Sequence, residues 1–332
     1  MLKKRIFVSG MAYGDGKSGT SVYINNVVEA LCVDHQVDLL LLEGDVFPVN
    51  HKNLNIKRVN KRLKKPILNM AWHLFILPFI YDYSVYDVVF LPAGNRRLFC
   101  RKLDNMVVTF HDLSQFHIAN KYDKFRTLYI KKVIPYFLKK VKNIVAISRS
   151  TKDDIVKYYR ISPNVISVNH NGYSAPNTNS SDEKLLKIDK KFVLYVARLE
   201  HPGKNHLNLL KAYEALPERI RGEFDLVLPG QDWSGNQEIK EYWSQMEQQS
   251  NVHFLGFVSN EQLEWLYQNA SLYVFPSFFE GFGLPLLEAM SYQVPIVCSN
   301  IPPLVEVGGD AVEVFEPSKH LDISEKIRLL LT

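Results

Sequence analysis

Two glutamates stand eight positions apart in the stretch SFFEGFGLPLLEAM, residues 277–290. Glu280 and Glu288 lie in apolar surroundings, where a carboxylate is costly unless a partner compensates it. The glycines between them and the following Leu284-Pro285 predict a helix start, where backbone amides and the helix dipole favour an anion such as a phosphate. Phe282 in this loop is expected to be exposed. Because two acids would repel a phosphate, we expect them to hold neutral hydroxyls on either side of it. The alternative is an ordinary helix start with one solvated and one capping glutamate.

Two cations follow another predicted strand, in VLYVARLEHPGKNHLNLL, residues 193–210. Arg198 and Lys204 lie on either side of Pro202-Gly203, in a loop between a strand and a helix. An arginine fork and a lysine point charge suit a diphosphate. Taken alone, the pair is better explained as two surface cations.

The elements that must position these residues alternate between strand and helix almost throughout the chain. Strands are predicted at 5–9, 37–42, 88–91, 107–110, 144–147, 165–168, 192–197, 225–228, 252–255, 271–275, 294–298 and 311–315. Helices are predicted between them, among them 21–31, 124–141, 205–216 and 259–270, the last with a Ser259–Gln262 capping box. Such alternation predicts an α/β fold of two Rossmann-like domains, with parallel sheets facing each other across a cleft. We place the domains at 1–170 and 191–332, with an Asn- and Ser-rich linker at 171–190.

With these motifs in place, the chain resembles the retaining glycosyltransferases of the GT-B fold, most closely glycosyltransferase family 4. The specific signal is FEGFGLPLLEAM together with the strand-end Arg198 and the following Lys204. Weaker similarities lie in GDGKSGTSVYINNVVEAL, VTFHDLSQFH, VAISRSTKDDI, VISVNHNGYS and LGFVSNEQL. The resemblance covers nearly the whole chain, although the final helices that usually cross back to the first domain look short or missing.

The resemblance implies roles for individual residues. The residues implied in chemistry are His111, beside the transferring sugar, together with Arg198, Lys204 and Glu280. Those implied in donor binding are Gly19, Arg198, Lys204, Gly256, Val258, Glu280, Gly281, Phe282, Gly283, Leu284 and Glu288. In this scheme Arg198 and Lys204 neutralise the diphosphate. Glu280 holds hydroxyls of the donor sugar, Glu288 holds the ribose, and Val258 lies near the base.

Neither a metal nor a separate cofactor is expected, because no Asp-x-Asp occurs in a loop suited to a metal and two cations with a helix N-terminus could stabilise the leaving diphosphate. The donor would be a UDP- or GDP-linked sugar. Front-face attack and a covalent intermediate both remain open. Two other functions are compatible with the fold: a nucleotide-sugar 2-epimerase and a non-catalytic sugar-nucleotide-binding subunit. A dehydrogenase is disfavoured, since GMAYGDGKSG is not a clean dinucleotide fingerprint.

Charge divides the chain into a basic and an acidic half. Residues 1–170 hold 27 Lys+Arg against 13 Asp+Glu, and residues 171–332 hold 13 against 22. Cations in the first half mix with apolar side chains, which predicts a surface for an anionic membrane. The residues expected to face it are Lys57, Arg58, Lys61, Arg62, Lys64, Lys65, Lys131, Lys132, Lys139 and Lys140.

Together with the resemblance, these patterns predict a cytoplasmic protein that is peripheral on the inner face of the cell membrane. There it would glycosylate a lipid-linked saccharide during assembly of O-antigen or capsule. Nucleic acid is not an expected partner, because no base-reading module accompanies the basic segments. Three scattered cysteines, in a chain of 332 residues, indicate neither a disulfide framework nor a zinc site.

Overall fold

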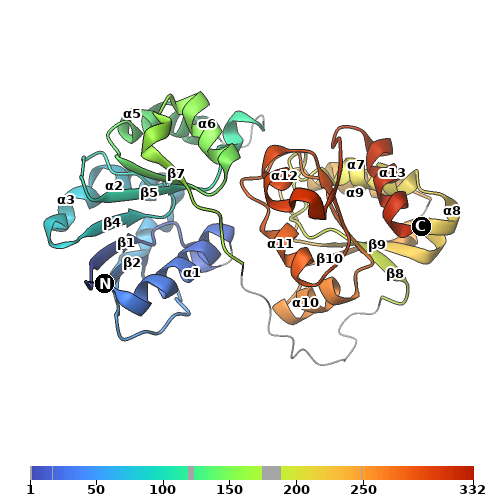
Figure 1. Ribbon diagram of the computed structural model, residues 1–332, viewed down its shortest axis with the longest axis horizontal. Helices are drawn as coiled ribbons and strands as arrows, with labels where there is room; N and C mark the ends of the chain where they lie inside the picture. The colour runs from blue at the N-terminus through green and yellow to red at the C-terminus, as the bar shows by residue number, and fades with distance from the viewer. Residues whose placement is uncertain (1, 17, 119–122, 174–187, 248) are drawn as a thin grey trace. The chain divides into compact units, whose positions relative to one another are not determined.

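The computed structural model describes residues 2–16, 18–118, 123–173, 188–247 and 249–332. They form two compact units, residues 1–171 and 172–332, each built around a parallel sheet (Figure 1). The linker predicted at 171–190 falls largely outside the described residues. None of the helices in the described part of the chain is long and apolar enough to cross a membrane.

The first unit contains a seven-stranded sheet in the order β3-β2-β1-β4-β5-β6-β7. Its strands are β1 (Arg5–Ser9), β2 (Gln36–Leu42), β3 (Leu54–Val59), β4 (Val88–Leu91), β5 (Met106–Phe110), β6 (Asn143–Ala146) and β7 (Ile166–Val168). Its α-helices are α1 (Gly19–Asp34), α2 (Pro66–Phe75), α3 (Leu77–Ile80), α4 (Lys124–Leu128), α5 (Ile134–Leu138) and α6 (Arg149–Tyr159). Between α4 and α5 the backbone is π-helical over Tyr129–Val133, next to Pro135, whose ring nitrogen cannot donate to the helical ladder.

Strand β3 was not predicted, because its sequence LNIKRV reads as part of a basic segment. It is an edge strand that pairs only with β2, so alternate polar positions are tolerated. The Lys57 ammonium lies 3.3 Å from the buried carboxylate of Asp38 and 2.9 Å from the hydroxyl of Tyr86. The charge of Lys57 therefore compensates an acid inside the sheet, and its contact with a membrane stays a prediction. Arg58 donates to the backbone carbonyls of Leu42 and Asp45.

The second unit contains a six-stranded sheet in the order β10-β9-β8-β11-β12-β13, again parallel. Its strands are β8 (Lys191–Leu194), β9 (Phe224–Pro229), β10 (Val252–Gly256), β11 (Leu272–Phe275), β12 (Ile296–Ser299) and β13 (Glu313–Phe315). Its α-helices are α7 (His206–Glu214), α8 (Glu218–Glu223), α9 (Asn236–Gln245), α10 (Asn260–Asn269), α11 (Leu284–Ser291), α12 (Pro302–Gly308) and α13 (His320–Leu331). The predicted capping box of α10 is confirmed: Ser259 and Gln262 exchange hydrogen bonds.

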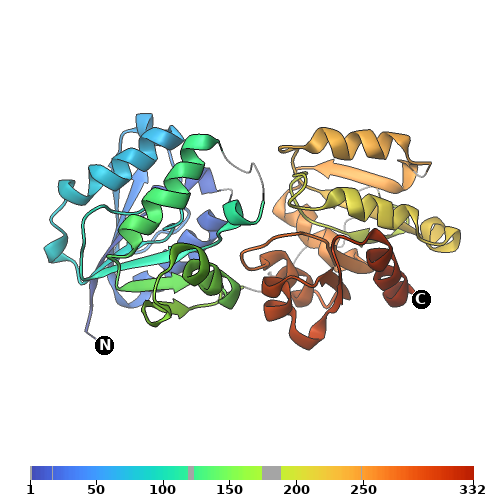
Figure 2. The same cartoon turned by 90° about the horizontal axis from the view of Figure 1, so that it is seen from above.

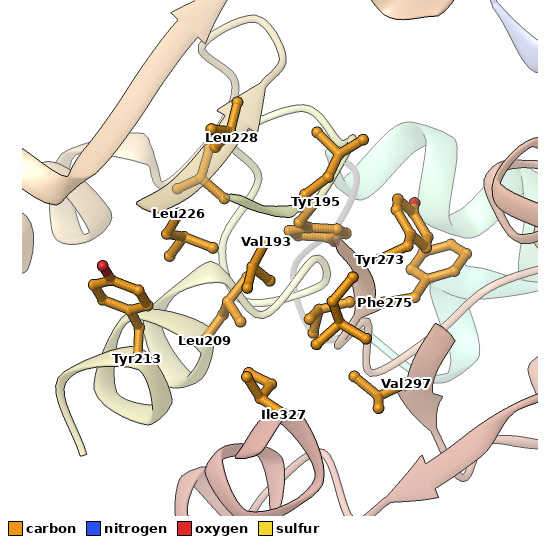
Figure 3. Close-up of a cluster of buried hydrophobic side chains, with 14 of the residues drawn as sticks. Val193, Tyr195, Leu209, Tyr213, Leu226, Leu228, Tyr273, Phe275, Val297 and Ile327 are labelled. Atoms are coloured by element: carbon orange, nitrogen blue, oxygen red, sulfur yellow. The ribbon is translucent and has the colours of Figure 1, made fainter. Parts of the chain in front are cut away.

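Helices cover both faces of each sheet (Figure 2), as expected for parallel strands joined by helical crossovers. In the second unit, strand side chains such as Val193 and Phe275 meet Leu209 of α7 and Ile327 of α13 in one apolar cluster (Figure 3). Complete burial of one such side chain contributes about 1.5–3 kcal/mol. This core holds the carboxyl ends of the strands, and the loops that leave them, in fixed positions.

Candidate active site

The loops that follow β8 and β11 are joined by hydrogen bonds. The two strands are neighbours in the sheet, so their carboxyl ends lie at the same edge. The side-chain amide of Asn205 donates to the carbonyl oxygens of Pro276 and Pro317, both at 2.8 Å. The backbone N–H of Phe278 donates to the carbonyl of Gly203 at 3.0 Å. These hydrogen bonds hold residues of the two loops together.

Lys204 and Glu280, one from each loop, form an ion pair. The ammonium nitrogen lies 2.7 Å from a carboxylate oxygen, and the two side chains are only 21% and 14% exposed. The hydroxyl of Tyr195 donates to the carbonyl of Lys204 at 2.8 Å, which fixes the backbone that carries the cation. The structure thus brings together two predicted residues that lie 76 positions apart in the chain.

The glycine loop ends at Gly283, the N-cap of α11. Its φ angle is +108°, and a Cβ there would lie 2.6 Å from Cδ2 of Leu304. Both the backbone conformation and the close approach therefore require glycine. Helix α11 starts directly after it, at Leu284. The positive end of the helix dipole therefore lies at this loop.

Phe282, in contrast, does not have the predicted exposure. Its side chain is only 5% exposed. The apolar ring is drawn into the protein, while the neighbouring Gly281 remains half-buried. The ring therefore anchors the loop, and any ligand contact of Phe282 would have to come from its backbone.

Glu288 lies one turn inside α11 and is mostly enclosed by protein. Burial raises the pKa of its carboxyl group, and the hydroxyl of Tyr267, which donates to it at 2.7 Å, partly opposes that rise. Tyr267 comes from α10. The carboxylate is thus a desolvated acceptor with one fixed donor, which suits a neutral hydroxyl as a second donor.

Arg198 has partners that the sequence reading missed. Its guanidinium lies 2.7 Å from the carboxylate of Glu200 and stacks over Trp233, with 4.5 Å from Cζ to the ring centroid. The signal for Glu200 was present, because residues two positions apart in extended chain share a side. Trp233 is distant in sequence and gave no such signal. Arg198 is therefore oriented by an acid and a ring, and its predicted contact with a diphosphate stays a prediction.

The predicted base loop follows β10 in the same unit. Gly256 ends that strand with φ +67°, and its carbonyl accepts from the N–H of Gly230 at 2.7 Å. Val258 is half-buried and packs on the apolar core just before α10. The structure places both residues beside the helix that supplies Tyr267.

In the first unit, His111 follows β5. Its Nε2 donates to the carbonyl of Pro92 at 2.6 Å, and the Tyr23 ring meets the imidazole edge-on at 4.8 Å between centroids. Burial lowers the pKa of His111, so the ring is neutral at pH 7 and its Nδ1 is an acceptor. Gly19 is exposed at the start of α1, and a Cβ there would meet no atom within 4 Å. Its glycine identity is therefore not required by packing within the chain.

Clusters of three or more His, Cys, Asp or Glu side chains arranged for a metal ion do not occur among the described residues. The charges gathered after β8 and β11 are instead an ammonium, a guanidinium and carboxylates. Such a set can bind a phosphate through its cations and sugar hydroxyls through its acids.

Comparisons with curated proteins find bacterial relatives of this chain. It is 35% identical over 237 residues to the O-antigen chain mannosyltransferase B of Escherichia coli, covering 68% of this chain and 61% of that protein. It is 27% identical over 235 residues to the O-antigen chain mannosyltransferase RfbU of Salmonella typhimurium, covering 69% and 63%. The match thus spans less than two thirds of the length of either relative. A Campylobacter jejuni N-acetylgalactosaminyltransferase, acting on a diphospho-undecaprenol-linked sugar by its name, is 24% identical over 90% of this chain and 81% of that protein.

Solved structures share the fold at low sequence identity. The sucrose-phosphate synthase of Thermosynechococcus elongatus superimposes with a TM-score of 0.74 and 17% identity, over 99% of this chain and 90% of that one. The Anabaena HepE protein, solved with UDP and glucose, gives a TM-score of 0.74 and 16% identity over the same shares.

Family models assign the two halves of the chain separately. The model described as Glycosyltransferase Family 4 matches residues 17–175. The model described as Glycosyl transferases group 1 matches residues 176–332. The two matches together run almost from end to end, and the chain therefore belongs to the glycosyltransferases of the GT-B fold.

Proposed function

We propose that this protein is a retaining, metal-independent hexosyltransferase that takes its sugar from a nucleoside diphosphate sugar. The observation that carries the proposal is the Lys204–Glu280 ion pair at the joined carboxyl ends of β8 and β11, beside the start of α11. A cation next to an acid can bind a nucleoside diphosphate sugar, the cation through the diphosphate and the acid through the sugar hydroxyls. The donor diphosphate would draw the ammonium, and the carboxylate would then accept hydrogen bonds from the sugar.

The chemistry follows from the charge that develops when the sugar leaves. The bond between the anomeric carbon and the diphosphate breaks, and negative charge accumulates on the phosphate oxygen. Once the donor is bound, Lys204, Arg198 and the dipole of α11 would stabilise that charge with no further rearrangement during the reaction. Glu280 would stabilise the positive sugar through its hydroxyls. In the first unit, the neutral His111 would offer its Nδ1 as a hydrogen-bond acceptor.

Relatives support a narrower substrate assignment. The E. coli and Salmonella proteins are named as O-antigen mannosyltransferases, and the Campylobacter protein is named for a diphospho-undecaprenol-linked acceptor. We therefore propose mannose as the hexose and a lipid-linked saccharide as the acceptor, in bacterial surface polysaccharide assembly.

Thermal-shift titration with UDP, GDP and their sugars tests the donor assignment. A ligand at about 100 times its dissociation constant adds about 2.7 kcal/mol to stability, a shift that is readily measured. One nucleotide and its sugar should stabilise the protein far more than the other. Release of nucleoside diphosphate only when acceptor is present supports transfer. Interconversion of the donor without acceptor would identify an epimerase, and binding without any turnover a non-catalytic subunit.

Chelation should leave turnover intact, because the proposed counter-charges are Lys204, Arg198 and a helix N-terminus. The measurement is the rate of nucleoside diphosphate release with and without EDTA. Loss of activity in EDTA, with recovery on adding Mg²⁺ or Mn²⁺, would mean that a divalent cation supplies the charge assigned to these residues.

A basic and apolar face of the first unit supports membrane docking. Phe75 at the end of α2 contacts Phe137 of α5, with 6.4 Å between ring centroids, so the helix after the basic stretch 57–65 meets the helix before Lys139 and Lys140. Lys140 lies over the Phe137 ring at 5.2 Å. Large side chains exposed on α2 and α3 include Ile67, Leu68, Phe75, Phe79 and Ile80, at 47–63%. Rings and aliphatic chains beside cations are typical of surfaces that rest on anionic lipids. We propose such an attachment, on the cytoplasmic face.

Reversing Lys61, Arg62, Lys64 and Lys65 to Glu should release the protein from vesicles containing anionic phospholipid. Each surface cation contributes about 1 kcal/mol at such a membrane. Turnover of a soluble acceptor should survive, because this segment lies outside the proposed donor site. Cosedimentation at low and high salt is the measurement. Vesicle binding that neither the substitutions nor salt weakens would contradict electrostatic docking.

A further inference from the structure

Two arginines follow β4 where the strand order of the first sheet reverses. The sheet runs β3-β2-β1-β4-β5-β6-β7, so the reversal lies between β1 and β4. In open parallel sheets, ligands bind outside the carboxyl ends of the strands at this point. The loop at residues 92–97 leaves β4 there and carries Arg96 and Arg97.

The loop is held firmly against β5. The N–H of Gly94 donates to the carbonyl of Thr109 at 2.7 Å, and a Cβ on Gly94 would lie 2.1 Å from Cγ1 of Val108. The carbonyl of Pro92 is the acceptor for His111. The two arginines are therefore carried by a fixed backbone, next to the histidine proposed to lie beside the transferring sugar.

Arg97 is a partly buried cation, and no acid is among the described groups that shift its pKa. Its Nε is buried and finds no hydrogen-bond partner in the described part of the chain, and its Nη1 donates to the carbonyl of Arg96. The hydroxyl of Tyr129 is likewise buried and unpartnered. The ion pairs found among the described residues include none with Arg97. Arg126, the other nearby cation, has its own acid in Asp123 at 3.5 Å.

The charge of Arg97 persists in this setting. Burial and the neighbouring Arg96 and Arg126 lower its pKa to about 10, so it remains protonated at neutral pH. Burial also raises the pKa of Tyr129, whose phenol therefore stays a donor. Keeping an uncompensated cation partly buried is costly, and an anion that binds the guanidinium fork would remove that cost.

We propose that Arg96 and Arg97 form a subsite for a phosphate or diphosphate group on the acceptor. The assignment rests on the proposed function, since it presumes an acceptor that carries such a group, as a lipid diphosphate does. The donor phosphates are assigned to Lys204 and Arg198 in the other unit. The arginines after β4, near His111, are therefore assigned to the acceptor.

Inorganic diphosphate tests the subsite without turnover. With the preferred nucleoside diphosphate at saturation, calorimetry should still detect one diphosphate site. Arg97→Gln should weaken that site at least about tenfold, as expected for a hydrogen-bonded charge. Arg97→Lys, which keeps the charge but loses the fork, should be intermediate. Arg160→Gln is the matched control, because Arg160 is exposed and caps the C-terminus of α6, before the amino end of β7. Absence of this site in the wild-type protein, or equal weakening by the control, overturns the proposal.

Matched acceptors separate the subsite from the rest of the function. One is a soluble alkyl-diphosphate saccharide, and the other is the same saccharide as a neutral alkyl glycoside. Arg97→Gln, and Arg96→Gln at the exposed neighbouring position, should raise KM for the first at least about tenfold and leave the second unchanged. Loss on both acceptors, weaker nucleoside diphosphate binding, or release from anionic vesicles would each overturn the assignment. If the wild-type protein binds no nucleoside diphosphate, the proposed function fails, while the diphosphate titration still reports on the arginines.

Discussion

Glu280→Gln should lower kcat by about 10- to 150-fold and change KM for the donor much less. Hydrogen bonds to a charged group are worth about 1.5–3 kcal/mol. Because Glu280 would act on hydroxyls of the sugar that becomes positive, that energy is realised mainly in the transition state and is lost from kcat. Gln keeps the volume and can still accept a hydrogen bond from Lys204, so the protein should stay folded.

Free nucleoside diphosphate affinity is the decisive second measurement for Glu280→Gln, because this ligand contains no donor sugar. The affinity should barely change. Glu241→Gln, on the exposed side of α9, is a matched control that should alter neither quantity. A large loss of nucleoside diphosphate affinity in Glu280→Gln would show that this acid organises the diphosphate site itself, through Lys204, and does not act on the sugar.

Glu288→Gln should show the complementary behaviour, weakening the donor and the free nucleoside diphosphate alike by about 10- to 150-fold. The carboxylate would hold the ribose, remote from the bond that breaks, so the loss falls on binding and leaves kcat nearly unchanged. Calorimetric titration of both variants with the same nucleoside diphosphate is the measurement. Equal weakening by the two substitutions would refute their assignment to opposite sides of the diphosphate.

Glu288→Gln should also raise the melting temperature of the ligand-free protein at neutral pH. The pKa of Glu288 is raised in the folded state, so the fold binds a proton more tightly than the unfolded chain does. The stability from that protonation is present below the unfolded pKa and is lost as pH rises through the folded pKa. A neutral Gln avoids the cost of the buried charge. An unchanged or lower melting temperature would mean that partners in the fold already compensate the carboxylate.

Acidification should weaken nucleotide binding at a higher pH than an ordinary glutamate would allow, because Glu288 must be ionised to accept two hydrogen bonds. Tyr267→Phe removes the donor that lowers this pKa, so the loss should move to still higher pH. Glu288→Gln should lack this component. Nucleotide affinity should be measured across pH in the wild type, Tyr267→Phe and Glu288→Gln. This comparison separates the titration of Glu288 from that of the nucleotide itself.

The alternation of short apolar runs with helical segments predicted the two parallel-sheet domains and most of their strands. Runs such as residues 5–9 and 88–91 became β1 and β4 with unchanged bounds, because buried parallel strands need continuous apolar chain whatever surrounds them. Edge strand β3 escaped prediction, since only one neighbour and one half-buried face act on it. Its Lys57 looked like a surface cation until the fold placed it beside Asp38.

The sequence also indicated candidate catalytic and binding side chains. The Glu-x7-Glu pattern at a helix start lies within one continuous segment, so it can be recognised without knowing the fold. Only the tertiary structure decided their partners. Lys204 meets Glu280 across 76 positions, Arg198 is taken by Glu200 and Trp233, and Tyr267 donates to Glu288 from another helix. The interpretation of the arginines after β4 depends on the strand order and on the absence of an acid among the described groups that shift the pKa of Arg97. Sequence patterns report local periodicity, whereas charge compensation and burial depend on contacts between distant segments, which exist only once the sheets have assembled.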